Sequence, residues 1–569
     1  MIKPRTLQLF NIATIACGLL AFFLLIRMPL DESRGQLIDY GQLRAITAAV
    51  MVSFLLALVA LMINHSLRPE RTQDVCGWLN RLLVPPTGHL FRLQFWLVIA
   101  IIFLIEAVLL TYFSVPVPLR PALLWVICTG IFAWVFLRIT FHQAYRQRPT
   151  LAMRVKNGWN DWSRTQQRVF IALAVIGLIT FIIYFPVNNG GRIHPDEDII
   201  YPDVANMLVS YDTFPEMLRK TFIIDTWWYG YPYFPISALP LIIPRLIYGN
   251  AFAENIQLNM LLLRQFISVL PMIVSIILLV YIVDEFKSPW LSVGMYVMLS
   301  LVPGVVRYNT RFWHPDSIIV LLVLLTFFFL KRDRLRYGTD FFLAAFMIGL
   351  ATAIKVWGLF FFLAIGGYLL AGVMEKKISV NRMIGLGLLF ILVMAGSFII
   401  TSPSILIPWN FRTYIDLMQD YYPTMRFGYD EPDPQGVYRT GLPAWMVFFR
   451  IHFMQDFFFY FCVFAGLAGS LAGREKTLNR LIMAWCTVVG TYLVGWIAVK
   501  SFQYLLPMMI PLYACAFMFP RLAGEKEYPR RLSLLNHPRT GTFLWVITLT
   551  MLAAQFYFNI RNIPLALRF

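Results

Sequence analysis

Long uninterrupted runs of apolar residues most constrain what this chain can fold into. About fifteen runs approach the roughly 20 residues that an α-helix needs to cross a bilayer, from 8–27 near the start to 542–559 near the end. Composition agrees, since 59% of the 569 residues are hydrophobic and 14% are charged, whereas soluble domains carry about 25% charged residues. The sequence therefore predicts an all-α polytopic membrane protein with about 13–16 spans, and it excludes a soluble globular protein.

The basic residues predict how these spans are oriented. The formal charge is +18, but Lys and Arg are scattered through short loops, as the positive-inside rule describes, rather than gathered on one face as in nucleic-acid-binding proteins. We therefore expect a lipid bilayer as a partner and no nucleic acid. The long loops 187–263 and 403–443 are expected to face outward. The loops expected on the cytoplasmic side, together with Met1, are 68–92, 146–168, 331–336, 376–382, 474–480 and 521–539.

The order of the spans also predicts a division of the chain. Residues 1–165 form an N-terminal extension of about four spans, 166–519 form a transmembrane core with both long outer loops, and 520–569 form a basic cytoplasmic loop and a final span. The first apolar run is too long for the core of a signal peptide, so we expect an uncleaved span. The cysteines are isolated, without a C-x-x-C pair or metal-ligand spacing, and indicate neither a disulfide framework nor a zinc site.

The first long outer loop places several acids directly beside a span. The sequence HPDED at 194–198 follows an NNGG turn, and Pro and Gly favour a tight turn there. A partly desolvated carboxylate at the bilayer edge is suited to act as a general base. Alternatively, these acids only cap a helix that begins near Ile199, and the residues alone leave both interpretations open. Amphipathic stretches around 202–220 and 236–248 are expected to lie in the membrane interface.

Further candidates are cations near the expected outer ends of spans. The sequence RYNTRFWHPD at 307–316 repeats the H-P-D motif, and Arg307 and Arg311 can bind a phosphate through forked hydrogen bonds. The alternative is an aromatic belt with snorkelling arginines. Single cations near the hydrocarbon are costly and often functional, although each also suits the role of an interfacial anchor. They are Arg264, Lys355 and Lys500.

These motifs, taken in order, resemble the GT-C superfamily of integral-membrane glycosyltransferases, in particular protein O-mannosyltransferases and the bacterial lipid A aminoarabinose transferase. The similarity covers about 181–380. Its features are the acidic pair Asp196 and Glu197, a stretch rich in Tyr and Pro that ends in Tyr248-Gly249, Arg264 at the start of the next span, and the H-P-D at 314–316. The segments GLATAIK at 349–355 and KSFQYLLPMMIP at 500–511 follow, and the second is similar to the R-Y-L-L-P segment of such enzymes.

The resemblance implies a GT-C-like helix bundle with interfacial helices in the first large outer loop of the core. It implies an inverting enzyme that moves a hexosyl or pentosyl group from a polyprenyl-phosphate donor to a hydroxyl of an envelope glycan, glycolipid or protein. Asp196 would be the general base, and Glu197 would orient it or the acceptor. The location implied is a bacterial inner membrane, with the active site facing the periplasm or exterior. The residues expected to bind substrates are His194, Arg264, Arg307, Arg311, His314, Asp316, Lys355, Lys500 and Tyr504.

Metal use and acceptor class are left open at this point. Some members of the superfamily use a divalent cation and others use none; Asp196, Glu197 and Asp316 can supply oxygen ligands, but the sequence shows no certain metal or cofactor site. The N-terminal extension departs from the family pattern, and so does the lack of a sizeable soluble domain, which leaves the acceptor class open.

Two other classes of function fit parts of the sequence. A transporter or a flippase for a lipid-linked sugar matches the composition, but transporters typically carry acids near the membrane midplane. Here the acids lie mainly in outer loops, and Glu106 is an exception within a span. A glycan polymerase or ligase would share an outer-face site but should depend on more loop arginines. A noncatalytic scaffold gives no reason for two H-P-D motifs on one side, so we favour the glycosyltransferase.

Overall fold

The structure is a computed structural model, and most of its described residues lie in one compact unit. Within the described residues the chain forms helices and no strands. The short helix α9 (Phe214–Phe222) and the first residues of α20, up to Arg412, belong to a separate unit. The predicted spans of the N-terminal extension lie outside the described residues. The described residues are 159, 161–189, 193–224, 229–402, 408–428, 438–473, 475–523, 535 and 537–568.

The helices of the main unit follow one another with short connections. Several are short 3-10 segments or a π-helical segment that join longer α-helices, so that one apolar run often holds two or more pieces. In chain order they are α7 (Arg164–Asn189), α8 (Pro195–Asn206), α10 (Tyr233–Ala238), η1 (Leu239–Leu241), α11 (Ile242–Tyr248), η2 (Gly249–Glu254), α12 (Ile256–Leu263), η3 (Arg264–Val269), α13 (Leu270–Asp284), α14 (Pro289–Ser300), α15 (Pro303–Arg311), α16 (Asp316–Asp333), α17 (Thr339–Ile354), η4 (Val356–Phe361), α18 (Phe362–Met374), α19 (Val380–Thr401), α20 (Pro408–Phe427), α21 (Leu442–His452), α22 (Asp456–Leu471), α23 (Lys476–Trp496), η6 (Phe502–Leu505), α24 (Leu506–Met518), η7 (Phe519–Leu522) and α25 (Pro538–Arg568).

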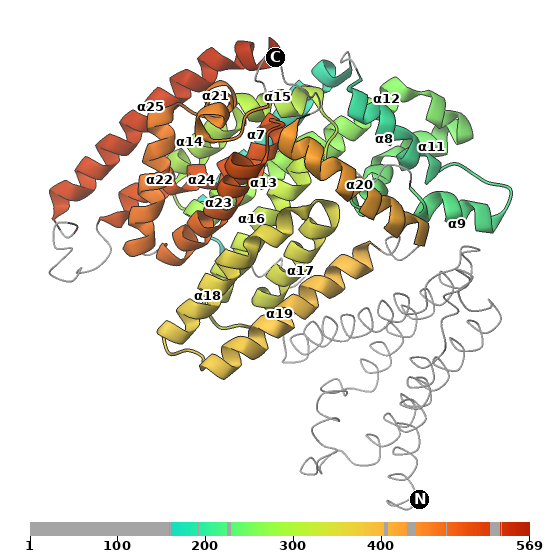
Figure 1. Cartoon of the computed structure of the whole chain (residues 1–569). Coiled ribbons are helices and arrows are strands. Elements are labelled where there is room, and N and C mark those ends of the chain that lie inside the picture. Colours follow the sequence, from blue (N-terminus) through green and yellow to red (C-terminus); the bar gives the residue numbers. More distant parts are fainter. Residues whose placement is uncertain are drawn as a thin grey trace, which may run out of the picture. The chain divides into compact units, whose positions relative to one another are not determined.

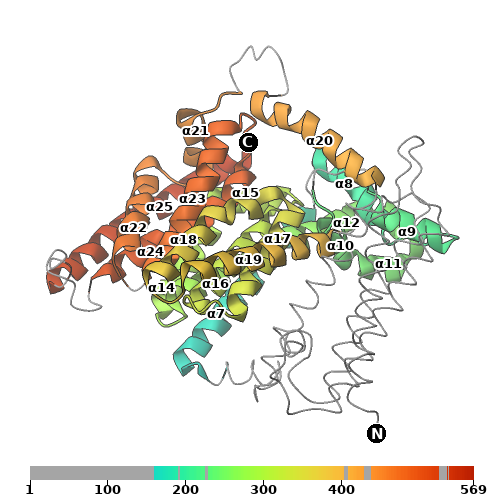
Figure 2. The same ribbon diagram turned by 60° about the horizontal axis from the view of Figure 1, so that its bottom comes forward.

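The described part of the chain confirms an all-α polytopic membrane protein. It contains 8 helices that are long and apolar enough to cross a membrane, or up to 10 if each of two bent pairs counts as one span. The segment Phe502–Leu522 is 94% buried inside the protein, whereas Arg164–Asn189 and Val380–Thr401 are only 22% buried. Thus α24 lies at the centre of the bundle, in contact with α13, α16, α22 and α23. The helices α7, α19 and α25 lie at its periphery (Figures 1 and 2).

Two apolar runs that were predicted as single spans, 289–306 and 444–471, are broken in the structure. The helices α14 and α15 meet at an angle of 60°, and the second break is sharper. The run 444–471 was expected to form a single helix, but α21 and α22 meet at an angle of 102°. The break is stabilised by polar side chains from distant helices: the Gln555 amide donates to the Phe453 carbonyl oxygen at 2.8 Å, and the Tyr513 hydroxyl donates to the same oxygen at 2.5 Å. Backbone groups freed within a membrane protein need such partners, and their positions cannot be read from the run itself.

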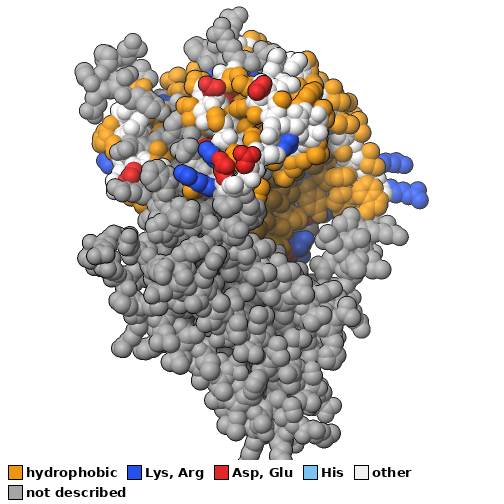
Figure 3. Space-filling model, turned by 90° about the vertical axis from the view of Figure 1, so that its right-hand side faces the viewer, with side chains coloured by type: hydrophobic (Ala, Val, Ile, Leu, Met, Phe, Trp, Pro, Cys, Tyr) orange, Lys and Arg blue, Asp and Glu red, His pale blue; other side chains and the backbone are white. Residues whose placement is uncertain are grey.

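The segment Tyr233–Glu254 also differs from a regular helix. It was expected to lie partly in the interface, and its length and hydropathy are those of a candidate span. It is divided into four short helices, consistent with Pro235, Pro240 and Pro244 within it. On α11 the side chains of Leu246 and Ile247 are 79% and 67% exposed. Figure 3 views the side on which α11 and α12 lie, and hydrophobic side chains cover much of the coloured surface there.

Candidate active site

The first turn of α8 is fixed by its own side chains. His194 is the N-cap residue, and its Nδ1 accepts a hydrogen bond from the backbone N–H of Asp196 at 3.2 Å. In return, Oε2 of Glu197 accepts from the backbone N–H of His194 at 2.8 Å, which completes a capping box. Pro195 occupies the first helical position, which suits its fixed φ. This arrangement turns the neighbouring Asp196 and Glu197 toward different environments.

Glu197 is fully buried, and several donors surround its carboxylate. Arg264 donates through Nε to Oε1 at 2.9 Å and through Nη2 to Oε2 at 2.5 Å. The backbone N–H of Trp313 donates to Oε1 at 2.7 Å. Arg264 is itself only 1% exposed. This forked ion pair therefore joins α8 to the start of η3 and to the loop before α16, and removing either partner leaves a buried charge without compensation.

The π-helical segment η3 brings this region together. A π-helical turn disturbs the regular hydrogen bonds of a helix, and such turns are frequent at functional sites. Here the carbonyl oxygen of Ile267 accepts a hydrogen bond from the hydroxyl of Ser317 at 2.8 Å. The Ser268 hydroxyl accepts from the backbone N–H of His314 at 3.3 Å. Segment η3 thus binds Glu197 through Arg264 and binds the H-P-D loop through its backbone and Ser268.

Asp196 differs from Glu197 in its exposure and its partners. Its side chain is 36% exposed, and its Oδ2 lies 3.6 Å from Nδ1 of His194. Because that nitrogen accepts the backbone hydrogen bond of the helix cap, it carries no proton in this arrangement, and the contact is not an ion pair. The His194 ring is held against Phe312, with ring centroids 4.8 Å apart. A half-exposed carboxylate of this kind can accept a proton from a bound molecule.

The second H-P-D motif forms a chain of polar contacts close to Asp196. His314 contacts Asp316 through Nδ1 and the hydroxyl of Tyr229 through Nε2. Asp316 is fully buried, and Lys355 Nζ lies 2.9 Å from its Oδ1. The Lys355 ammonium also lies 4.8 Å from the ring centroid of Tyr504. Residues from distant parts of the chain therefore meet near His314 and Asp316; they are Tyr229, Lys355 and Tyr504.

Burial sets the protonation states of His314 and Tyr229 in this series of polar contacts. It lowers the pKa of His314 below its ordinary value, although the nearby Asp316 carboxylate opposes this effect. Burial also raises the pKa of the Tyr229 hydroxyl well above its ordinary value, and the negative charge of Asp196 adds to that increase. At neutral pH, neutral Tyr229 therefore donates to Nε2 of neutral His314, and Nδ1–H of His314 donates to Asp316. The negative charge of Asp196 therefore acts on both Tyr229 and His314.

Gly230 allows Tyr229 to reach His314. Its backbone N–H donates to the carbonyl oxygen of Ile354 at 2.9 Å, immediately before Lys355. A Cβ atom at Gly230 would lie 1.5 Å from the carbonyl oxygen of Ala353, a backbone atom that cannot move aside by a side-chain rotation. The close approach of these two backbones thus requires glycine, and it positions Tyr229 and Lys355 next to each other.

We expect Gly230→Ala to lower the stability of the protein by at least about 1–3 kcal/mol, as overpacking of a closed site does. The added methyl group must push the Tyr229 loop away from α17, so any activity that depends on this site should fall as well. Thermal unfolding of the purified protein checks the effect on stability. Gly366→Ala is the matched control, because no atom lies within 4 Å of a Cβ built there, and it should not destabilise the protein.

Three further residues were predicted to bind substrates. They are Arg307, Lys500 and Arg311. Arg307 packs over the Phe502 ring with its Cζ 4.8 Å from the centroid, and Phe502 also contacts Phe312 at 5.5 Å. Lys500 Nζ donates to the carbonyl oxygen of Ala498 at 3.0 Å. The side chain of Arg311 lies outside the described residues. Thus Lys355 and Tyr504 join the His314 cluster, while Arg307 borders it through aromatic contacts.

Sequence reasoning assigned no role to Tyr229, Gly230 or Ser268. Tyr229 and Gly230 belong to the YGYPY stretch that contributes to the resemblance, and the only available signal was this unusual density of Tyr and Pro. No group of three or more His, Cys, Asp and Glu side chains in the described residues is arranged to hold a metal ion.

The described helices and the buried polar site define an integral-membrane protein with a candidate catalytic centre at one end of the bundle. The model of glycosyltransferase family 87 matches residues 231–425. This match and the many apolar helices fit a GT-C-like integral-membrane glycosyltransferase, as the sequence motifs predicted. The matched segment includes Arg264, the H-P-D loop and Lys355, and it begins after Asp196 and Glu197. No curated protein matches this sequence.

Proposed function

We propose that this glycosyltransferase moves a hexosyl or pentosyl group from a polyprenyl-phosphate donor to a hydroxyl of an envelope glycan, glycolipid or protein, with inversion at the anomeric carbon. The site faces the noncytoplasmic side of a bacterial inner membrane. The proposal keeps 166–519 as the catalytic core, 1–165 as an extension and 520–569 as a cytoplasmic loop with a final span. The orientation rests on the distribution of basic loops.

The contrast between two adjacent acids carries the proposal. Glu197 is fully buried and bound to Arg264, whereas the side chain of Asp196 is 36% exposed, and its charge acts on His314 and Tyr229. A group that only stabilises structure gains from complete pairing, as Glu197 does. A general base must instead reach the proton that it removes. Asp196 meets this requirement, and it lies in the first outer loop, where the resemblance to GT-C enzymes implies the base.

The reaction requires little covalent chemistry from the protein. Asp196 takes the proton of the acceptor hydroxyl while the acceptor oxygen attacks the anomeric carbon of the sugar. The bond between that carbon and the phosphate oxygen breaks from the opposite side, and polyprenyl phosphate leaves with the bonding electrons. Lys355 is the cation placed to stabilise the charge that develops on the phosphate, because its ammonium is half-buried between Asp316 and Tyr504.

The remaining residues position these groups. We assign Glu197 and Arg264 to the support of the first turn of α8, because the two side chains form a buried ion pair with each other. His194 caps that turn, and His314 and Asp316 hold Tyr229 and Lys355 in place. Arg307, Arg311, Lys500 and Tyr504 remain candidates for contacts with the donor phosphate or the sugar.

Tyr229→Phe is expected to lower kcat about tenfold, and the protein should still fold, with a loss in the free energy of unfolding of about 1–3 kcal/mol. The substitution leaves the ring in place but removes the donor to His314 Nε2, and an unsatisfied buried acceptor costs about 1–3 kcal/mol. Because neutral His314 then lacks its partner, its protonation at low pH becomes easier, and the acidic limb of the rate profile should move to higher pH. Tyr248→Phe, at the half-exposed end of α11, is the control and should change neither quantity.

The donor class is tested by turnover of the full-length protein reconstituted in lipid. Polyprenyl-phosphate sugars and polyprenyl-diphosphate sugars are offered in parallel with candidate envelope acceptors, and release of the free lipid phosphate is measured. The proposal expects release from a monophosphate donor that depends on an acceptor. Release from diphosphate donors alone would favour a polymerase or ligase. Movement of an intact lipid-linked sugar across the bilayer without release would favour the flippase.

A further inference from the structure

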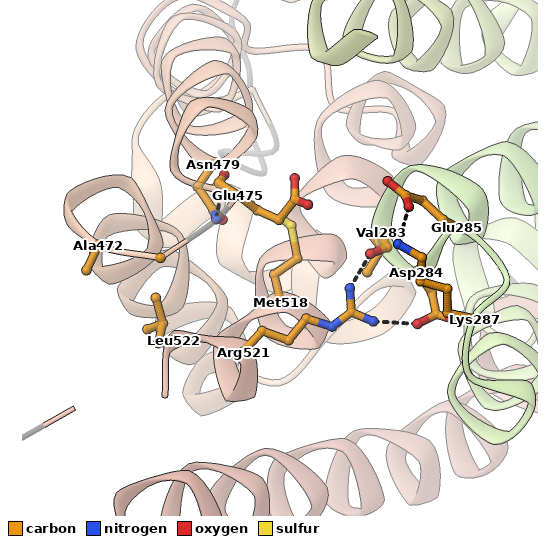
Figure 4. A pocket seen from close by; sticks show the side chains of 11 residues that line it. Val283, Asp284, Glu285, Lys287, Ala472, Glu475, Asn479, Met518, Arg521 and Leu522 are labelled. Atoms are coloured by element: carbon orange, nitrogen blue, oxygen red, sulfur yellow. Dashed lines mark hydrogen bonds and ion pairs between the residues drawn. The ribbon is translucent and has the colours of Figure 1, made fainter. Parts of the chain in front are cut away.

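A second polar site lies at the opposite end of α13 from the candidate active site. A cavity of about 200 Å³ is bordered by the end of α13, the end of α22, the start of α23 and the end of α24 (Figure 4). The helical path from Arg264 to Asp284 separates the two sites by about 30 Å at 1.5 Å per residue. Its lining includes Glu475, Asn479 and Arg521, which belong to the segments 474–480 and 521–539 that the sequence predicts to be cytoplasmic. On this orientation we expect the cavity to lie at the depth of the lipid headgroups on that side.

The cavity presents both signs of charge. Its walls include the carboxylates Asp284, Glu285 and Glu475 and the cations Lys287 and Arg521. Arg521 is bound to Asp284 and also donates to the carbonyl oxygen of Val283 at 2.5 Å. Lys287 Nζ lies 2.5 Å from Glu285 Oε2, and Lys331 Nζ lies 3.2 Å from Glu475 Oε1, so a ligand would share these charges with their partners in the protein. These walls suit neither a simple anion, which would face three carboxylates, nor a simple cation, which would face an arginine and a lysine. A zwitterionic group fits both sets of side chains.

The acidic wall is arranged around a buried amide. Asn479 is 3% exposed, and its Oδ1 has no hydrogen-bond partner among the described residues. Its Nδ2 donates to the backbone oxygen of Glu475 at 3.2 Å, so both residues belong to the same wall of the cavity. Figure 4 shows the side chains of Glu475 and Asn479 on the side of the cavity opposite Lys287. A buried acceptor without a donor is costly, and an N–H group of a ligand would satisfy it.

The lining residues also discriminate between kinds of ammonium group. None of the 11 residues that line the cavity is aromatic. Quaternary ammonium groups are typically recognised by aromatic cages and have no N–H to donate. A primary ammonium can donate to Asn479 and pair with Glu475, while Arg521 and Lys287 can hold phosphate oxygens. The cavity volume of about 200 Å³ is large enough for a small polar headgroup.

We propose that this cavity binds a phosphoethanolamine group, presented as the headgroup of a phosphatidylethanolamine molecule in the adjacent leaflet. The ammonium lies against Glu475 and Asn479, and the phosphate lies against Arg521 and Lys287. The apolar side chains of Met518 and Leu522, which also line the cavity, are suited to contact the first carbons of the lipid. The proposal is independent of the sugar donor and of Asp196.

The test measures thermal unfolding of the full-length protein in nanodiscs of phosphatidylcholine while phosphatidylethanolamine with the same acyl chains is added. We expect phosphatidylethanolamine to raise the unfolding midpoint in a saturable manner, and added phosphatidylcholine to have no effect. For Glu475→Gln, at least about tenfold more phosphatidylethanolamine should be needed for the same shift. Lys287→Ala should weaken the response in the same direction, and Lys287 is exposed enough for this variant to fold.

Glu375→Gln is the matched control, because Glu375 is a partly exposed acid paired with Lys377 at 3.1 Å and does not line the cavity. Its response to phosphatidylethanolamine should equal that of the unaltered protein. Free phosphoethanolamine is tested in phosphatidylcholine nanodiscs; a shift equal to that given by the lipid would show that the ligand is a soluble compound and overturn the lipid assignment. Equal shifts with both lipids, or an unchanged response in both Glu475→Gln and Lys287→Ala, would overturn the site itself.

Discussion

Asp196→Asn is expected to lower the rate of sugar transfer at least about a hundredfold while the protein remains folded. The change is nearly isosteric, but an amide cannot accept the proton of the acceptor hydroxyl, and a lost general base typically costs about 10²–10⁴ in rate. Folding should be preserved because the cap of α8 uses the backbone N–H of Asp196 and not its carboxylate. The measurement is kcat in lipid-reconstituted protein, together with the thermal unfolding midpoint.

Asp198→Asn is the control for this prediction. Asp198 lies in the same first turn of α8 and is exposed, so the substitution removes the same charge from the same helix end. Its rate should stay within about twofold of the unaltered protein, since an exposed charge near a helix terminus contributes only about 0.3–1 kcal/mol. If Asp196→Asn retained full activity, or if both variants lost activity equally, Asp196 would not be the base.

Glu197→Gln is expected to act on folding rather than on chemistry. The substitution leaves the buried Arg264 guanidinium without a counter-charge, and breaking a buried ion pair typically costs about 3–5 kcal/mol. The amide also places an N–H₂ group near the donors of Arg264, Trp313 and His194 that now surround the carboxylate. We expect a large loss in the free energy of unfolding, measured by denaturant titration in mixed micelles.

Asp456→Asn provides an exposed pair for comparison. Asp456 is bound to Arg450, but the side chains of this pair are 34% and 59% exposed, and surface pairs contribute about 0–1 kcal/mol. A double-mutant cycle with Glu197→Gln and Arg264→Gln should show strong coupling, because the two residues share one network. Additive effects in that cycle, or a loss no larger than that of Asp456→Asn, would contradict the structural role assigned to Glu197.

The sequence predicts the class of fold because hydrophobic length is a local property. The length and hydropathy of an apolar run can be read from the run alone, so α7, α19 and α23 correspond to predicted spans. The break between α21 and α22 could not be predicted in the same way. It depends on hydrogen bonds from Tyr513 and Gln555 to Phe453, and these residues lie far along the chain.

In the candidate site, too, contacts between residues close in sequence could be predicted, and contacts between distant residues could not. The spacing of His194 and Glu197 is that of a capping box, with His in the place that Ser or Thr usually takes, so the buried role of Glu197 had a local signal. Its partner Arg264 had none, since the contact depends on the π-helical segment η3. The contact of Tyr229 with His314 joins residues 85 positions apart, and no spacing rule predicts it.

Photo-crosslinking with the sugar donor tests the central claim most directly. A polyprenyl-phosphate sugar with a photoreactive group on the sugar is bound to the full-length protein in lipid, and labelled peptides are mapped with and without excess unlabelled donor. We expect labelling in the segments that contain Asp196, His314 and Lys355, and excess unlabelled donor should suppress it. The same labelling should occur in Asp196→Asn, because that variant still binds the donor. Donor-suppressed labelling confined to other segments, such as the walls of the cavity at the far end of α13, would contradict the assignment of the active site.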